Sequence, residues 1–330
     1  MQACLLAVDS GGTKSDALLV ALDGRVLGRG RCEVGDPHSG RGAGGSGRSE
    51  RSVTEAVRRA LATAPVRAGI HVIGRSALPV DALAKCGGTQ LSAAWVTEES
   101  AALALAGEIC GVVVLAGTGA LCHASTPEGT SVTLDALGPL LGDHGSAFQI
   151  GLLAVRAVGQ ASWHERHATT LAEAVPKALA RFLSEEDGRF EMVPYMLMCR
   201  DRAEIASLAR LVDEHASAGD RVAMGILRTA AEDMAGSVRD VTDRAGVGDR
   251  ALAMVGTGSV AVGSDFYWSA LCATVACFAP NLRPMRHRRP AVLGVLLAGA
   301  AGVPGVDANL RERLLDQIPA DAIRSEEETT

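Results

Sequence analysis

The sequence has few aromatic residues, few lysines and no excess of positive charge. Aromatic side chains make up 3% of the 330 residues, so we expect a core built from Ala, Val and Leu. Of the 32 basic residues only three are lysines (Lys14, Lys85 and Lys177), and the formal net charge is −6. This charge gives no reason to expect a nucleic-acid partner. The length allows two domains, each with a sizeable core.

The eight cysteines show no C-x-x-C pair and no metal-ligand spacing. The two closest, Cys272 and Cys277, fall on an expected helix and are predicted to be small core residues. No uninterrupted run of 18 apolar residues occurs, so we expect no membrane partner. Because no signal-peptide pattern precedes the first expected strand, the reducing cytoplasm is the expected location.

Near the N-terminus an apolar strand runs into a glycine turn. Residues 5–14 read Leu-Leu-Ala-Val-Asp-Ser-Gly-Gly-Thr-Lys, and a second apolar strand follows over 15–21. Glycines in such a turn expose N–H groups that can cradle a phosphate, and Asp9 could hold Mg²⁺ through water. The candidate phosphate-binding residues are Gly11, Gly12, Thr13 and Lys14. An ordinary β-hairpin explains the segment equally well, whereas a Walker loop is excluded by the spacing.

The same pattern of strand and glycine turn occurs twice more. Residues 111–116 enter the turn Gly117-Thr118-Gly119, and residues 251–255 enter a turn that contains Gly258 and Ser259. Three such turns favour a duplicated domain that closes on one nucleotide.

The remaining pattern alternates strands with amphipathic helices, which predicts an α/β protein with two lobes that divide near residues 106–111. Expected strands cover 4–9, 15–21, 26–32, 70–73, 93–96, 111–116 and 251–255, and a short strand lies between Gly119 and the turn 127–129. Expected helices cover 53–63 (capped by Ser52), 81–85, 100–106, 148–160, 168–182, 202–217, 220–245, 267–277, 291–301 and 309–317. The Gly- and Ser-rich loop 40–47 could close over a substrate or be a surface insertion, and 325–330 is an acidic tail that we expect to be disordered.

Two carboxylates outside the glycine turns could carry chemistry. Glu98 follows an expected strand and starts a helix that Thr97 could cap, so it is either a general base or an acid that stabilises the first helical turn. Asp143 lies in a glycine-flanked loop before another helix, where it could bind sugar hydroxyls or act as an N-cap.

These motifs together resemble the sugar kinase, Hsp70 and actin superfamily, and more closely the group that holds N-acetylglucosamine kinase and the BadF/BadG/BcrA/BcrD ATPases. Residues 9–16 are similar to D-G-G-G-T-K-[ST]-D and residues 116–120 to S-G-T-G-S, the two phosphate motifs of the family. Residues 138–146 are similar to G-x-x-x-G-D-E-G-S, and residues 255–260 to the adenosine motif. The resemblance implies a two-lobed actin-like ATPase fold of duplicated ribonuclease-H-like domains with a cleft between the lobes, here residues 1–107 and 108–330.

Three departures from the family pattern lie on the acceptor side. Glu98 stands where the family has an Asp that takes the proton of the acceptor hydroxyl, and its extra methylene shifts the carboxylate. His38 stands where an Asn usually contacts the sugar, and His144 replaces the Glu of G-D-E-G-S. The nucleotide side keeps the family pattern, which suggests a changed acceptor more than a lost activity.

The resemblance therefore implies an ATP- and Mg²⁺-dependent kinase for a hydroxyl of a sugar or amino sugar. Glu98 would be the base, Asp9 the metal organiser, and His38, Asp143 and His144 the acceptor contacts. The alternatives are an ATPase that activates a partner, for which no convincing cysteine pair is present, and a nucleotide-binding regulator without kinase activity. The sequence does not name the sugar, and a homodimer and a monomer both stay open.

Overall fold

The chain folds into two compact units in a computed structural model that describes residues 3–11, 14–33, 45–62, 69–75, 79–180 and 202–319. The first unit joins residues 1–109 to 287–330, and the second comprises residues 110–286. Four features expected from the sequence lie outside the described residues: Gly12 with Thr13, His38, the first half of the 40–47 loop, and the acidic tail.

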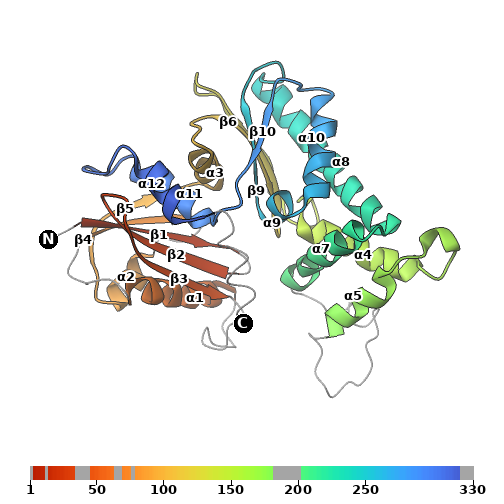
Figure 1. Cartoon of the computed structure of the whole chain (residues 1–330), viewed down its shortest axis with the longest axis horizontal. Coiled ribbons are helices and arrows are strands. Elements are labelled where there is room, and N and C mark those ends of the chain that lie inside the picture. The colour runs from red at the N-terminus through yellow and green to blue at the C-terminus, as the bar shows by residue number, and fades with distance from the viewer. Residues whose placement is uncertain are drawn as a thin grey trace. The chain divides into compact units, whose positions relative to one another are not determined.

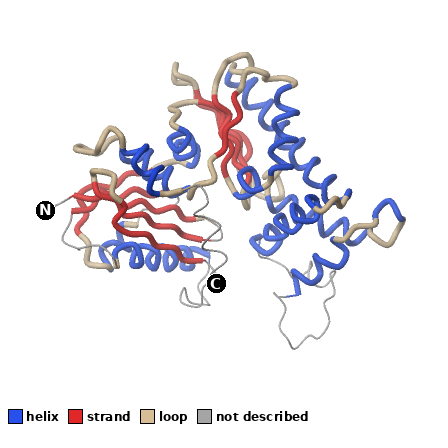
Figure 2. The backbone as a smooth tube through the Cα atoms, in the orientation of Figure 1, coloured by secondary structure: helices blue, strands red, loops and turns tan. Residues whose placement is uncertain are grey.

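The first unit is built on a five-stranded mixed sheet (Figures 1 and 2). In spatial order its strands are β3 (Val26–Glu33), β2 (Lys14–Ala21), β1 (Ala3–Ser10), β4 (Gly69–Arg75) and β5 (Thr89–Trp95). The pairs β1–β2 and β2–β3 are antiparallel, whereas β1–β4 and β4–β5 are parallel. The carboxyl ends of β1, β4 and β5 therefore meet at one edge of the sheet.

Helices cover both faces of this sheet, because residues on β1 alternate between two apolar clusters. Leu6 and Val8 pack in the cluster with α1 (Gly45–Leu61) and α2 (Val80–Lys85). Leu5 and Ala7 pack in the cluster with α3 (Glu98–Ala106), α11 (Ala291–Ala300) and α12 (Leu310–Gln317).

The C-terminal helices correct the expected division of the chain. We expected residues 108–330 to form one lobe, but α11 and α12 belong to the first unit. The sequence of α11 is apolar on all sides, and the helix packs against both β1 and α3. A Cβ added at Gly294 would lie 2.3 Å from the carbonyl oxygen of Ala101, so the two helices approach closely only because this residue is glycine.

The second unit repeats the sheet of the first. Its strands in spatial order are β10 (Arg283–Arg286), β9 (Ala253–Thr257), β6 (Gly111–Ala116), β7 (Ala120–Ser125) and β8 (Ser131–Asp135). As in the first unit, the central strand pairs antiparallel with the next strand in sequence and parallel with a later one. The repeated order confirms the predicted α/β fold with two related lobes, although β8 and β10 were not predicted.

The helices of the second unit enclose a core of small aliphatic side chains around the buried Tyr267. Those among the described residues are α4 (Ala147–Gln160), α5 (Leu171–Ala180), α7 (Arg202–Ser217), α8 (Arg221–Ala245), α9 (Ser259–Gly263) and α10 (Asp265–Ala276), with a 3₁₀ turn at Glu165–His167. Ala, Val and Leu dominate this core, as the scarcity of aromatic residues predicted. In the part of the chain that the structure describes, no helix has the length and apolarity that crossing a bilayer requires.

Three local predictions are wrong. Residues 45–47, expected to belong to the 40–47 loop, are the first residues of α1. Ser52 is not an N-cap, because α1 begins at Gly45; Ser52 is buried within the helix and its hydroxyl lies 2.8 Å from that of Ser15 on β2. Cys277 is not a core residue: α10 ends at Ala276, and the Cys277 side chain is exposed just beyond that end. Cys272, one turn earlier, is half-buried against the core.

Candidate functional site

In the first unit the candidate phosphate turn joins β1 to β2. The N–H of Gly11 donates to the carbonyl oxygen of Lys14 at 2.9 Å, which closes the described part of the turn. Asp9 lies near the end of β1, opposite Asp16 on β2 and opposite Arg75 on β4. The antiparallel pairing of β1 with β2 makes this turn a hairpin connection, one of the two interpretations that the sequence left open.

Arg75 joins the two carboxylates that the sequence analysis singled out. Its Nε donates to Asp9, and its Nη1 lies 2.9 Å from Oε2 of Glu98. The exposed fractions of the three side chains are 14% for Arg75, 12% for Asp9 and 35% for Glu98. Sequence reasoning missed Arg75, since only the parallel register of β1 and β4 brings it beside Asp9.

Glu98 is the first residue of α3, and the predicted cap is confirmed. The hydroxyl of Thr97 accepts a hydrogen bond from the N–H of Ser100 at 3.3 Å. Burial raises the pKa of Glu98; the charge of Arg75 lowers it and that of Asp9 raises it, and the net direction is upward. Its carboxylate is therefore a better proton acceptor than that of an ordinary exposed glutamate.

Lys14 and Asp16 end the first turn motif and lie on β2. Nζ of Lys14 lies 4.0 Å from Asp16, and 39% of the Lys14 side chain is exposed. Arg31 on β3 donates to both carboxylate oxygens of Asp16, at 2.6 and 3.4 Å. A buried chain of hydroxyls, Ser10 to Ser15 to Ser52, ties the turn to α1.

In the second unit the two later glycine turns lie against each other. The N–H of Gly117 donates to the carbonyl oxygen of Gly119 at 2.9 Å, which closes the turn. Gly258 has φ +88°, and a Cβ there would lie 2.4 Å from the carbonyl oxygen of Ala116. Thr118 at the first turn is half-buried and Ser259 at the second is exposed. Both turns therefore present backbone and small polar groups at the end of the same pair of strands, β6 and β9.

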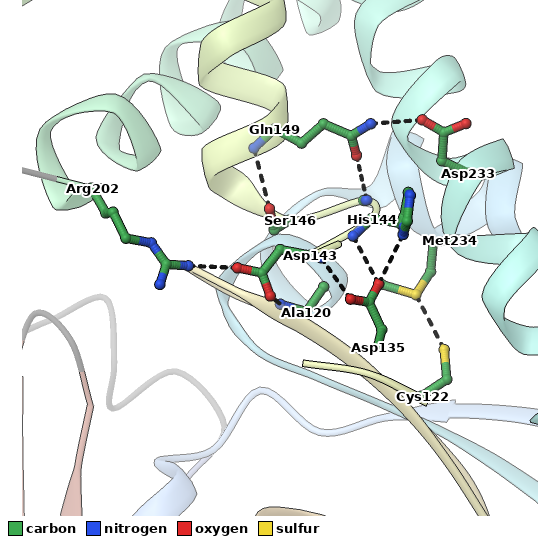
Figure 3. Close-up of polar contacts among 11 residues, drawn as sticks. Ala120, Cys122, Asp135, Asp143, His144, Ser146, Gln149, Arg202, Asp233 and Met234 are labelled. Carbon is green, nitrogen blue, oxygen red and sulfur yellow. Dashed lines mark hydrogen bonds and ion pairs between the residues drawn. The ribbon is translucent and has the colours of Figure 1, made fainter. Parts of the chain in front are cut away.

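Asp143 ties the loop before α4 to the first of these turns (Figure 3). Its Oδ1 accepts the N–H of Ala120 at 3.1 Å, and its Oδ2 lies 2.5 Å from Nη2 of Arg202. The side chain is 5% exposed and the backbone has φ +59°. Ser146, not Asp143, caps α4, since its hydroxyl accepts the N–H of Gln149 at 3.2 Å. The simple capping role considered for Asp143 is thus wrong.

His144 extends into solvent beside a buried carboxylate that sequence reasoning missed. Oδ2 of Asp135 accepts the His144 N–H at 2.9 Å and lies 3.0 Å from its Nδ1 (Figure 3). Oδ1 of Asp135 accepts the N–H of Asp143 at 2.6 Å. Half of the His144 side chain is exposed, whereas that of Asp135 is 4% exposed. Asp135 therefore orients the loop, and the imidazole of His144 stays accessible.

Gln149 and Asp233 form the other support of this loop. The side-chain oxygen of Gln149 accepts the Gly145 N–H at 2.5 Å, and its nitrogen donates to Asp233 at 2.6 Å (Figure 3). Asp233 lies 84 residues further along the chain, so no local motif predicts the contact. Positive φ values at Asp135, Ala136 and Asp143 show that the backbone here is held in uncommon conformations.

The donor set fits Mg²⁺ bound mainly by phosphates and water. Within the described ranges no group of three or more His, Cys, Asp or Glu side chains is arranged to hold a metal ion. Magnesium sites with nucleotides commonly use one or two carboxylates, with the other ligands from phosphates and water. Arg75 contacts Oδ1 of Asp9, so a metal-bound water would use the other carboxylate oxygen, Oδ2.

Comparison of the chain with known proteins finds a matching family. The model of the BadF/BadG/BcrA/BcrD ATPase family matches residues 6–271, which include all three glycine turns. The chain belongs to this family. The match confirms the resemblance stated from the motifs.

Two curated relatives of this BadF-family chain carry kinase names. The chain is 30% identical over 169 residues to the N-acetylmuramic acid/N-acetylglucosamine kinase of Clostridium acetobutylicum, a match that covers 50% of this chain and 54% of that protein. It thus spans about half the length of that relative. It is 26% identical over 258 residues to the N-acetyl-D-glucosamine kinase of Dictyostelium discoideum, covering 73% of this chain and 80% of the other.

Solved structures share the fold of this BadF-family chain. A candidate N-acetylglucosamine kinase from Chromobacterium violaceum has a TM-score of 0.64 at 22% identity, over 90% of this chain and 98% of that one. A ROK-family glucokinase from Streptomyces griseus, solved with glucose and AMPPNP, has a TM-score of 0.54 at 16% identity, over 90% and 98%. These likenesses confirm the predicted actin-like α/β fold of two related lobes.

Proposed function

We propose that the protein is an ATP- and Mg²⁺-dependent kinase that phosphorylates a hydroxyl of a sugar or amino sugar resembling N-acetylglucosamine. The observation that carries the proposal is the pairing of Glu98 with Asp9 through Arg75, at the carboxyl edge of the first sheet. A phosphoryl transfer needs a base for the hydroxyl and an acidic group that organises the metal, one beside the other. The names of the two curated relatives support the choice of acceptor.

Each candidate residue takes one role in this reaction. The nucleotide phosphates are assigned to the two phosphate turns and the adenosine to the third: Gly11, Gly12, Thr13, Lys14, Gly117, Thr118 and Gly119, then Gly258 and Ser259. Asp9 would hold the Mg²⁺ through water, and the bound metal would neutralise charge on the phosphates. Glu98 accepts the hydroxyl proton while the hydroxyl oxygen bonds to the γ-phosphorus. The bond from that phosphorus to the β–γ bridging oxygen breaks, and ADP leaves with the electron pair.

On the acceptor side, the exposed imidazole of His144 is better placed for the sugar than the carboxylate of Asp143. Both oxygens of Asp143 already have partners, Ala120 and Arg202, so Asp143 positions the loop. His144 keeps Nε2 for a hydroxyl while Asp135 holds Nδ1. His38 stays an assigned acceptor contact from the motif comparison alone. We also assign the kinase to the cytoplasm, without a membrane or nucleic-acid partner.

The test is a mass-spectrometric search for a phosphorylated product. The protein is incubated with Mg²⁺-ATP and a panel of sugars, amino sugars and N-acetyl amino sugars. Glu98→Gln should abolish the product, and Glu99→Gln, which changes the next residue of the same helix, should retain it. ADP without a phosphorylated sugar would instead support a coupled ATPase, and ATP binding without turnover would support a regulator.

A further inference from the structure

The guanidinium of Arg75 occupies the space between two acidic side chains that face the same sheet edge. Asp9 comes from β1, Arg75 ends β4, and Glu98 follows β5, and these three strands are parallel. Ligands of open α/β sheets commonly bind outside the carboxyl ends of such strands. Arg75 is thus held at the ligand side of the sheet rather than within its core.

The contacts of Arg75 leave part of its hydrogen-bonding capacity unused. A guanidinium has five N–H donors, and Arg75 directs Nε at Asp9 and Nη1 at Glu98. Nη2 has no hydrogen-bond partner among the described residues. A planar guanidinium with spare N–H donors matches the geometry of a phosphoryl group. Without this cation, the two carboxylates would repel the negatively charged phosphoryl group.

The proposed reaction brings a phosphoryl group to this place. On that function, from which this inference starts, Asp9 lies on the metal side of the γ-phosphate and Glu98 beside the acceptor hydroxyl. The phosphoryl group must therefore pass between the two carboxylates that Arg75 bridges. During transfer the negative charge of the phosphoryl group spreads over three oxygens. A fixed cation nearby therefore stabilises the transition state more than it stabilises the bound substrates or products.

We propose that Arg75 contacts the phosphoryl group during its transfer and stabilises the charge that develops on it. The other cation of the first turn is less suited to this role. Lys14 is 39% exposed, its ammonium lies 4.0 Å from Asp16, and its strand β2 is separated from β4 by β1. Asp9 and Glu98 in turn hold the guanidinium in place, so the cation needs no rearrangement when the phosphoryl group arrives.

The experiment compares three variants of the full-length protein. Arg75→Met removes the charge but keeps much of the side-chain volume. Arg75→Lys keeps the charge but loses the planar guanidinium and its paired N–H donors. Arg58→Met is the control, because Arg58 is 62% exposed and pairs with Glu55 on α1 of the same unit. Circular dichroism and thermal unfolding verify that each variant folds. The readouts are kcat and KM with Mg²⁺-ATP, and calorimetric affinities for ADP with and without fluoroaluminate, which mimics the phosphoryl group in transfer.

We expect Arg75→Met to lower kcat by about 10²- to 10³-fold, as loss of one fixed donor to a developing charge does elsewhere, with KM values changed much less. Arg75→Lys should recover part of this loss, and Arg58→Met should match the wild type. Fluoroaluminate should raise the affinity of the wild-type protein for ADP by roughly 10²-fold or more, as transition-state analogues do. Arg75→Met should lose this gain while its affinity for ADP alone stays the same.

The outcomes separate this inference from the proposed function. If no sugar is phosphorylated but Arg75→Met loses the fluoroaluminate gain, the kinase assignment fails and the role of Arg75 stands. If sugar phosphorylation depends on Glu98 while Arg75→Met keeps kcat or keeps the fluoroaluminate gain, the role of Arg75 is overturned. Wild-type protein that gains no affinity from fluoroaluminate overturns it as well.

Discussion

The carboxylate of Asp143 accepts the backbone N–H of Ala120 at 3.1 Å, across 23 residues of chain. Ala120 directly follows the turn Gly117–Gly119, so this bond fixes the loop 138–146 to the second phosphate turn. The other carboxylate oxygen of Asp143 lies 2.5 Å from the guanidinium of Arg202, which neutralises the charge of the carboxylate. One buried carboxylate thus links a candidate acceptor loop to a candidate nucleotide turn.

Asp143→Ala should destabilise the protein and loosen this loop. The substitution leaves the buried N–H of Ala120 without its partner, which costs about 1–3 kcal/mol of unfolding free energy. Urea denaturation measures the loss. Glu128→Gln is the control: Glu128 is 63% exposed and pairs with Arg250, and ion pairs at the surface add little to stability. If the two substitutions lowered the free energy of unfolding equally, this would contradict the stabilising role of the hydrogen bond between Ala120 and Asp143.

Gly258→Ala should disrupt the third glycine turn. Its φ of +88° disfavours any side chain, and the added Cβ would lie 2.4 Å from the backbone of Ala116. We expect a loss of more than about 2 kcal/mol in stability and a weaker affinity for ATP, measured by denaturation and calorimetry. Gly236→Ala on α8 is the matched control, because open space surrounds that residue. It should stabilise the protein by about 0.5–1 kcal/mol.

The acid side of the pH profile should report the environment of Glu98. Its pKa lies above the ordinary 4.5 because of burial, with Arg75 opposing and Asp9 adding to the shift. The base works only when ionised, so kcat/KM should fall as the pH drops through this raised pKa, at a higher pH than for an exposed glutamate. Initial rates between pH 4 and 9 test this, once acid unfolding is shown to begin lower. A rate that stays flat down to about pH 4 would contradict the role of Glu98.

Asp220 should make the protein more stable above pH 4 than near pH 2. Burial raises its pKa, but hydrogen bonds from the Ala223 N–H and from Thr169 and Thr170 outweigh this and bring the pKa from 3.8 to about 2. Because the folded state holds the ionised form, this stability is present above the unfolded value and disappears as the pH falls through about 2. Asp220→Asn should flatten this part of the stability curve, measured by urea denaturation from pH 2 to 6. Asp249→Asn, an exposed position, should leave the curve as it is.

The sequence alone determined the local elements that place the site. The three glycine turns, the apolar strand that becomes β1, and the cap Thr97 of α3 all follow from neighbouring residues. Such features depend on backbone conformation and on the side chains within a few positions, and both can be read along the chain. The helix expected over 220–245 matches α8 nearly to the residue; in the structure Asp220 caps its start and Gly246 its end.

Only the tertiary structure decided which charges meet. Arg75 is 66 residues from Asp9, and Asp233 is 84 residues from Gln149, so their contacts depend on strand register and helix packing. The return of α11 and α12 to the first sheet is of the same kind, since an apolar helix can bury itself against any open apolar face. Hydrophobic burial specifies that a segment must be covered but not by what, whereas an ion pair needs two side chains in one place. The sequence could therefore name the carboxylates of the site, and the fold was needed to find the arginine between them.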